Sequence, residues 1–174
     1  MKTFRIATYN VNSVRSRLPI VLSWLEKNRP SVLCLQETKT EDAKFPVKEF
    51  EEAGWHVAYR GGKGYNGVAI VSSGKADQVA LGLDDGGPAD EDRLIRAVIS
   101  GIAVVNTYVP QGFERESPRF AYKLDWFRRL RKFFAKHYKP DQMVLWCGDL
   151  NVAREEIDVH NPKRLLGHVD FTPE

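Results

Sequence analysis

The feature that most constrains the fold of this chain is a series of short apolar runs rich in β-branched and aromatic residues. Several of them, such as residues 32–35, are apolar at successive positions, which is typical of strands in a sheet covered on both faces. Helical patterns separate some of the runs, so the sequence predicts an α/β fold. The expected strands cover residues 4–10, 32–36, 56–59, 67–72, 95–99, 103–108 and 143–147.

Three helices are expected between the strands. The first has its apolar repeat between Leu18 and Leu25 and ends before Pro30, and the second covers residues 47–53. The longest covers residues 118–138, and we expect its apolar stripe to face the core and its basic residues to lie mostly elsewhere. The stripe consists of Phe120, Leu124, Phe127, Leu130 and Phe134, and the basic residues are Arg119, Lys123, Arg128, Arg129, Arg131, Lys132 and Lys136.

The composition is that of a globular protein. Of the 174 residues 43% are hydrophobic and 28% charged, enough for one domain with a sizeable core over residues 1–174. The formal net charge of +3 permits a nucleic-acid partner without requiring one. Cys34 and Cys147 each lie in an apolar run, which favours small buried hydrophobes over a disulfide or metal pair. No run has transmembrane length and no signal peptide is apparent, so we expect a cytoplasmic protein without a membrane partner.

Polar side chains follow four of the expected strands at the point where each strand ends. If these strands are neighbours in one sheet, their ends converge at one rim, which is where open α/β sheets place their sites. The polar residues are Asn10 and Asn12 after the first strand, Gln36 and Glu37 after the second, Tyr108 after the sixth, and Asp149 and Asn151 after the last.

These residue types suit metal-assisted chemistry. Glu37 is the best candidate ligand for a hard cation such as Mg²⁺, with Asn10 beside it. Asp149 can orient or deprotonate an attacking water, Asn151 can hold that water or a phosphate oxygen, and Tyr108 can donate to charge developing on a phosphate. From the residues alone, a structural role remains open, because a single strand-end Glu is usually solvated and Asp-x-Asn is usually a turn or a helix cap.

Five ordered segments carry a resemblance to a known family. They are IATYNVNSVR at residues 6–15, LQETK at 35–39, GYNGVAI at 64–70, VNTYVPQG at 105–112 and WCGDLNVA at 146–153. In these segments and their order the chain resembles the exonuclease III and AP endonuclease family of the endonuclease/exonuclease/phosphatase superfamily. The resemblance implies a DNA-repair phosphodiesterase that uses Mg²⁺, or alternatively Mn²⁺, on double-stranded DNA with abasic sites or 3′ ends.

The resemblance also assigns roles residue by residue. It implies that Glu37 is a metal ligand with Asn10 close by, that Tyr108 contacts the scissile phosphate, and that Asp149 and Asn151 position the nucleophile. Substrate contacts are expected from Asn12, Gln111 and Arg119, the last two to the DNA backbone. The basic face of the longest helix remains open between a DNA track and a solvated surface.

The implied fold is a four-layer αββα sandwich, of which this chain is expected to hold mostly the first sheet and its covering helices. Family members continue into a second half, so we expect the inner face of the first sheet to be exposed and available for self-association. Two other functions remain open: a catalytically silent DNA-binding or self-associating half-domain, and another phosphodiesterase or phosphatase of the superfamily.

Overall fold

The computed structural model describes residues 3–174, apart from the side chain of Glu91, so Met1 and Lys2 lie outside the described residues. The described chain divides into two compact units. The first unit holds the residues up to Tyr108 together with Tyr138–Asp149, and the second holds Val109–His137 and Leu150–Glu174.

All strands of the two sheets belong to the first unit. Within the described residues the first sheet, sheet A, has four strands in the order β1-β2-β4-β3. β1 and β2 are parallel, with Asn10 paired to Gln36 at their ends, and the other neighbours are antiparallel. The strands are β1 (Ile6–Asn10), β2 (Val32–Gln36), β3 (His56–Arg60) and β4 (Val68–Ser72).

The second sheet, sheet B, also has four strands in the described part of the chain, in the order β5-β6-β7-β8. β7 and β8 are parallel and end together, because Tyr108 is paired with Asp149. The strands are β5 (Asp77–Leu81), β6 (Leu94–Ile99), β7 (Ile102–Tyr108) and β8 (Val144–Asp149). β5 was not expected, because its sequence Asp-Gln-Val-Ala-Leu is half polar and the strand is largely exposed at the sheet edge.

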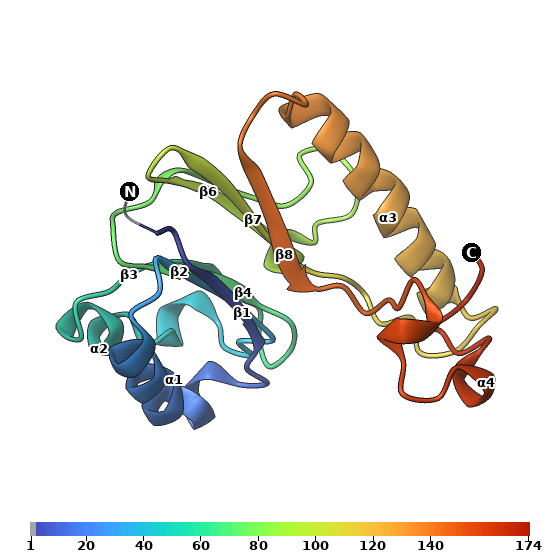
Figure 1. Cartoon of the computed structure of the whole chain (residues 1–174), viewed down its shortest axis with the longest axis horizontal. Coiled ribbons are helices and arrows are strands. Elements are labelled where there is room, and N and C mark those ends of the chain that lie inside the picture. The colour runs from blue at the N-terminus through green and yellow to red at the C-terminus, as the bar shows by residue number, and fades with distance from the viewer. Residues whose placement is uncertain (1–2) are drawn as a thin grey trace. The chain divides into compact units, whose positions relative to one another are not determined.

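Two apolar clusters hold the first unit together as layers. The helices α1 (Val14–Asn28) and α2 (Val47–Glu52) cover one face of sheet A, while sheet B lies against the other face (Figure 1). β2 shows the division: Leu33 and Leu35 belong to the helix-side cluster, and Val32 and Cys34 belong to the cluster between the sheets. All five residues of β2 are buried, as the apolar run at residues 32–35 predicted for four of them.

The α/β class with two sheets is confirmed, but the expected exposed inner face of sheet A is wrong. Val32, Val68 and Ile70 on that face are fully buried, because sheet B of the same chain packs against them. The predicted self-association through that face therefore has no such surface to use. Cys34 is buried in the inter-sheet cluster and the half-buried Cys147 packs against it, both as free thiols.

The second unit is built around α3 (Pro118–His137), which agrees with the expected helix, and it also contains the short α4 (Pro162–Leu165). The predicted apolar stripe of α3 is partly wrong. Its buried residues are Phe120, Lys123, Trp126, Arg129, Leu130 and Phe133, whereas Leu124, Phe127 and Phe134 are only half-buried. The helix is rotated from the expected face because it buries the Lys123 ammonium among oxygen acceptors. None of the helices in residues 3–174 is both long and apolar enough to cross a membrane.

Sheets A and B are also joined by buried carboxamides close to the strand ends. Gln36 Nε2 on β2 donates to Asn106 Oδ1 on β7 at 2.7 Å and to Thr8 Oγ1 at 3.0 Å. Asn106 Nδ2 in turn donates to the carbonyls of Leu35 and Ala69, each at 2.9 Å. Because these groups lie between the sheets, the register of the sheets is specified by hydrogen bonds as well as by apolar contact.

Replacing Gln36 with leucine should therefore destabilise the chain. The change leaves the buried Asn106 oxygen without its 2.7 Å donor, and an orphaned buried acceptor costs about 1–3 kcal/mol. Urea unfolding followed by circular dichroism measures the loss. The matched control is Gln142→Leu, which removes an exposed carboxamide that accepts from the Lys139 N–H at 2.8 Å. Because water can replace this exposed bond, the control should lose clearly less stability than Gln36→Leu. Equal losses in the two variants would contradict the role given to Gln36.

Candidate active site at the strand ends

One carboxamide brings two carboxylates together at the rim of the first unit. Asn10 Nδ2, at the end of β1, donates to Glu37 Oε1 at 2.8 Å and to Asp149 Oδ2 at 2.7 Å. Its Oδ1 accepts from the backbone N–H of Asn12 at 3.1 Å, which fixes the orientation of the amide group. Asn10 and Glu37 follow strands of sheet A and Asp149 ends a strand of sheet B. The predicted convergence of strand ends therefore occurs across two sheets rather than within one.

Glu37 is held by three donors. Besides Asn10, Lys39 Nζ lies 2.7 Å from Glu37 Oε2, and the Tyr108 hydroxyl hydrogen-bonds to the carboxylate. Burial raises the pKa of Glu37, but the hydrogen bonds from Asn10, Lys39 and Tyr108 outweigh this effect and leave its pKa below the ordinary value. Glu37 is therefore a carboxylate at neutral pH.

Tyr108 is positioned by its strand partner and by an arginine. Asp149 is its neighbour across β7 and β8. The guanidinium of Arg93 lies 4.9 Å from the centre of the Tyr108 ring, and Arg93 Nη1 donates to the Tyr108 carbonyl at 3.2 Å. Burial and the negative charge of Glu37 raise the pKa of Tyr108 to about 12, although the positive charge of Arg93 opposes the rise. The phenol is therefore a proton donor over the whole physiological range.

Sequence reasoning missed Lys39, Arg93 and Asn66. Arg93 Nη2 donates to Asn66 Oδ1 at 2.9 Å, and the Asn66 carbonyl accepts from the backbone N–H of Lys39 at 2.9 Å. These contacts tie the loop after Glu37 to the segment that follows β3. Lys39 and Asn66 stand in two of the segments that carry the family resemblance, but charged and amide residues in loops read as solvated surface.

Gly148 shows why a glycine precedes Asp149. Its φ is +143°, and a Cβ at this position would lie 2.0 Å from the Thr107 carbonyl oxygen. No other residue fits between the two parallel strands at this point. The Gly148 conformation therefore allows β8 to approach β7 closely where Asp149 leaves the sheet.

The predicted substrate residues, together with the predicted catalytic residue Asn151, divide between the two units. Asn12 belongs to the first unit, where its Oδ1 accepts from Lys39 Nζ at 2.5 Å. Asn151, Gln111 and Arg119 belong to the second unit. There Asn151 Nδ2 donates to the Val109 carbonyl at 2.9 Å.

Gln111 and Arg119 are both exposed, and both contact Phe113. Gln111 Oε1 accepts from the Phe113 N–H at 2.7 Å, and the Arg119 guanidinium lies 5.3 Å from the Phe113 ring centre. The two side chains are therefore arranged around one exposed aromatic ring in the second unit.

The rim offers hard oxygen donors rather than a preformed metal cage. Among the residues that the structure describes, no group of three or more His, Cys, Asp or Glu side chains is placed to hold a metal ion. Glu37 supplies one carboxylate, which fits a cation such as Mg²⁺ that keeps several waters. Asn10 presents its amide N–H groups to Glu37 and its oxygen to the Asn12 N–H, so its amide would have to turn before its oxygen could bind the same ion. The ammonium of Lys39 beside Glu37 shows that this position accommodates positive charge.

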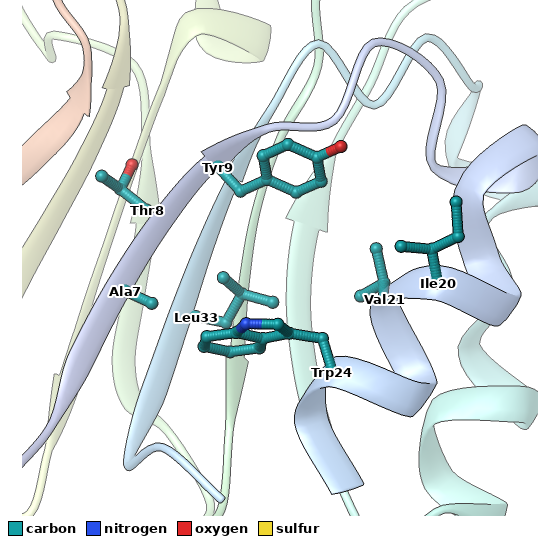
Figure 2. A pocket seen from close by; sticks show the side chains of 7 residues that line it. All are labelled: Ala7, Thr8, Tyr9, Ile20, Val21, Trp24 and Leu33. Carbon is teal, nitrogen blue, oxygen red and sulfur yellow. The ribbon is translucent and has the colours of Figure 1, made fainter. Parts of the chain in front are cut away.

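The first unit also has an apolar cavity. A cavity of about 290 Å³ opens between β1 and α1, and Figure 2 shows the Tyr9 and Trp24 side chains pointing toward the space between these elements. Its lining lacks carboxylates and cationic groups. The lining residues are Ala7, Thr8, Tyr9, Ile20, Val21, Trp24 and Leu33.

The fold and the rim define a class: α/β chains with two packed sheets and with carboxylates and carboxamides gathered at the strand ends. Comparison with known proteins gives the family. Residues 7–173 match the model of the Endonuclease/Exonuclease/phosphatase family, and the chain belongs to this family.

Individual relatives agree with the family assignment. Exodeoxyribonuclease III of Haemophilus influenzae is 29% identical, and the match covers 98% of this chain and 68% of that protein. The solved structure of an AP endonuclease from Archaeoglobus fulgidus is 53% identical with a TM-score of 0.95, covering 97% of this chain and 65% of that one. The 3′ phosphatase NExo from Neisseria, solved with a product DNA hairpin, is 35% identical with a TM-score of 0.95, covering 98% and 66%. The chain thus spans about two thirds of the length of these relatives.

The carboxylate of Glu37 should set the titration of Tyr108. Because the Tyr108 pKa is raised to about 12, the stabilisation from the protonated phenol is fully present below the unfolded pKa of about 10. It is lost as the pH rises through about 12. In Glu37→Gln the Tyr108 pKa should fall, since the charge that opposes the phenolate is gone. Tyrosine ¹³Cζ NMR titration, with the Tyr108 resonance assigned through Tyr108→Phe, measures this, and an unchanged midpoint would contradict the coupling.

Proposed function

We propose that this chain carries the catalytic core of a divalent-metal-dependent DNA phosphodiesterase of base excision repair, similar to exodeoxyribonuclease III. Its reactions would be incision on the 5′ side of an abasic site and removal of nucleotides from a 3′ end. The observation that carries the proposal is the Asn10 carboxamide, which bonds at 2.8 and 2.7 Å to Glu37 and Asp149 at one rim. The names of the relatives, an exodeoxyribonuclease and an AP endonuclease, support the DNA substrate.

Glu37 and Asn10 would hold the metal ion. When bound, a divalent cation at this position neutralises phosphate charge and lowers the pKa of a coordinated water. Because three donors already keep Glu37 ionised, the ligand needs no deprotonation before it binds the ion. Its partner Lys39 would have to share the carboxylate with the cation or move away from it.

Asp149 and Tyr108 would act on the reacting groups. Asp149 is oriented by the amide of Asn10, so that its carboxylate can accept a proton from an attacking water or fix that water in place. Tyr108 would turn its single O–H from Glu37 to a phosphate oxygen, where negative charge develops. A pKa of about 12 keeps the Tyr108 phenol in the donating form throughout the reaction.

DNA contacts would come from Asn12, Gln111 and Arg119, with Asn151 beside the nucleophile. An abasic nucleotide is an economical target, because no base has to be unstacked when the sugar leaves the helix. The name of the Neisseria relative adds a 3′-phosphate end as a further substrate to test.

The central experiment measures incision of a labelled duplex that contains one abasic site, with Mg²⁺ and with chelator. Parallel substrates carry a recessed 3′-hydroxyl end or a 3′-phosphate. The 174-residue chain should cut only with metal, and Asp149→Asn should lower the rate by about 100-fold or more, as expected for a group that acts on the nucleophile. DNA binding without incision on any of the three substrates would contradict the enzymatic proposal and support the silent DNA-binding alternative.

Metal dependence should separate Glu37 from Asp149. Glu37→Gln should raise the Mg²⁺ concentration needed for half-maximal rate, because it removes the proposed carboxylate ligand. Asp149→Asn should instead lower the rate even at saturating Mg²⁺. Rate measurements over a metal titration test this division, with direct Mg²⁺ binding by calorimetry as a readout independent of turnover. Proportional losses at every metal concentration in both variants would contradict the assigned roles.

The DNA-backbone role of Arg119 predicts a change in salt dependence. Arg119→Ala should weaken binding to any duplex sequence and reduce the slope of log K against log salt by about 1. The matched control on the same helix is Arg128→Ala, which removes an exposed guanidinium that lies 3.9 Å from Asp125. Fluorescence anisotropy over a salt series measures both variants. A slope unchanged in Arg119→Ala would remove this residue from the DNA contact.

A further inference from the structure

The ammonium of Lys123 is a buried charge of the second unit with four oxygen acceptors around it. Lys123 lies on α3 with 2% of its surface exposed. Its Nζ donates to the carbonyls of Asn151 at 2.6 Å and Val169 at 2.7 Å, and to Asp170 Oδ1 at 3.1 Å. The carbonyl of Gln111 lies at 3.3 Å. The three N–H groups therefore make three short hydrogen bonds, and one of them is shared with the more distant Gln111 carbonyl.

The cost of burying this charge explains why so many acceptors surround it. An ammonium taken out of water is tolerated only with a compensating charge and a complete set of hydrogen bonds. The Asp170 carboxylate supplies the charge, and backbone carbonyls supply the remaining acceptors. The ammonium holds the carbonyls of Asn151 and Val169 most firmly, because these are its two shortest bonds. With four acceptors for three N–H groups, the 3.3 Å contact to the Gln111 carbonyl is the one that can lengthen without leaving a donor unpaired.

Three separate segments meet at this ammonium. Residues 109–112 contribute Gln111, residues 150–153 contribute Asn151, and residues 168–171 contribute Val169 and Asp170. Other bonds run between the same segments: Asn151 Nδ2 donates to the Val109 carbonyl at 2.9 Å, and the Ala153 N–H donates to the Asp170 carbonyl at 2.6 Å.

The side-chain stem of Lys123 is also enclosed. A Cβ on Gly112 would lie 3.1 Å from Lys123 Cδ and 3.2 Å from Phe120 Cδ2, so the chain passes directly over the stem. Gly112 follows Gln111 in the segment that carries the proposed DNA contact. The lysine therefore has both its stem and its charged end fixed by the segments around it.

We propose that Lys123 is a positioning residue that sets the places of Asn151 and Gln111 relative to each other. Asn151 is the proposed holder of the nucleophile and Gln111 a proposed contact to the DNA backbone, so the inference rests on the proposed function. The Lys123 ammonium thereby links Asn151, which would orient the nucleophile, to Gln111, which would contact the DNA backbone. Displacement of a positioned group by about 1 Å can lower a rate by about 100-fold.

The first test uses amide hydrogen exchange by NMR and does not depend on activity. In Lys123→Met, an apolar side chain of similar length, exchange of the Ala153 N–H should accelerate and the Asn151 side-chain amide resonances should shift. Amides of sheet B such as Val104 should keep their protection. The matched control is Lys132→Met, an exposed lysine on the same helix, which should leave all these signals unchanged.

Each outcome of the exchange experiment decides the proposal. Loosening confined to residues 109–112, 150–153 and 168–171 supports positioning. Faster exchange throughout the second unit overturns the proposal, because a residue that only stabilises the whole unit gives this result. Unchanged exchange also overturns it, because it would mean that Lys123 holds none of these segments. If Lys123→Met does not fold, Asp170→Asn serves instead, since it removes only the half-buried carboxylate partner and should loosen the same segments to a smaller degree.

The second test uses the kinetic constants on an abasic duplex. Lys123→Met should lower kcat by about 10- to 100-fold and raise KM only a few-fold, while Lys75→Met, at an exposed lysine of the first unit, changes neither constant. If Lys123→Met only lowered the fraction of active enzyme, the reaction amplitude would fall while the kcat and KM of the active fraction stayed at the wild-type values. This result would mean a structural role only and overturn the proposal. A wild-type chain that does not cut at all contradicts the proposed function, whereas the exchange result still decides the role of Lys123.

Discussion

The structure of the rim depends on one carboxamide placed between two carboxylates that come from different sheets. Asn10 has two N–H groups, and they reach Glu37 at 2.8 Å and Asp149 at 2.7 Å. Two carboxylates this near one amide repel each other unless donors or a cation compensate them. The geometry therefore requires sheets A and B to pack in one register, which the apolar inter-sheet cluster and the Gln36–Asn106 hydrogen bond specify. The contacts that form the core between the sheets therefore also position the residues of the site.

The backbone is strained at the places where polar side chains leave the strands. Asn12, Glu37 and Asn151 have φ values of +41°, +51° and +46°, in the left-handed region that Asn tolerates and that Glu adopts at a cost. Such positions cost about 1–3 kcal/mol and persist only where surrounding contacts impose them. Around Glu37 the contacts are hydrogen bonds from neighbouring loops, and at Asn151 they are the bonds to Val109 and Lys123. Strain of this kind often accompanies functional sites.

Sequence reasoning recovered the strands that are buried on both faces and the polar residues at their ends, because both leave local patterns. It did not recover Lys39, Arg93 or Lys123, since a charged residue in a loop or on a helix has the same local pattern whether it is solvated or coordinated. Lys123 is the plainest case: its acceptors come from segments up to 47 positions away in the chain. The covering of sheet A by sheet B was also missed, because a strand such as β2 shows that both its faces are buried but not what covers them.

The most direct test of the account is to locate a bound cation. Mn²⁺ prefers oxygen ligands as Mg²⁺ does, and its unpaired electrons broaden NMR signals of nearby nuclei. At substoichiometric Mn²⁺ the amide signals around Asn10, Glu37 and Asp149 should broaden first, while Val32 and Ser72, paired at the opposite end of sheet A, should stay sharp. Competition by Mg²⁺ should restore the lost signals. Broadening centred elsewhere, or spread evenly over the chain, would contradict a metal-dependent site at this rim.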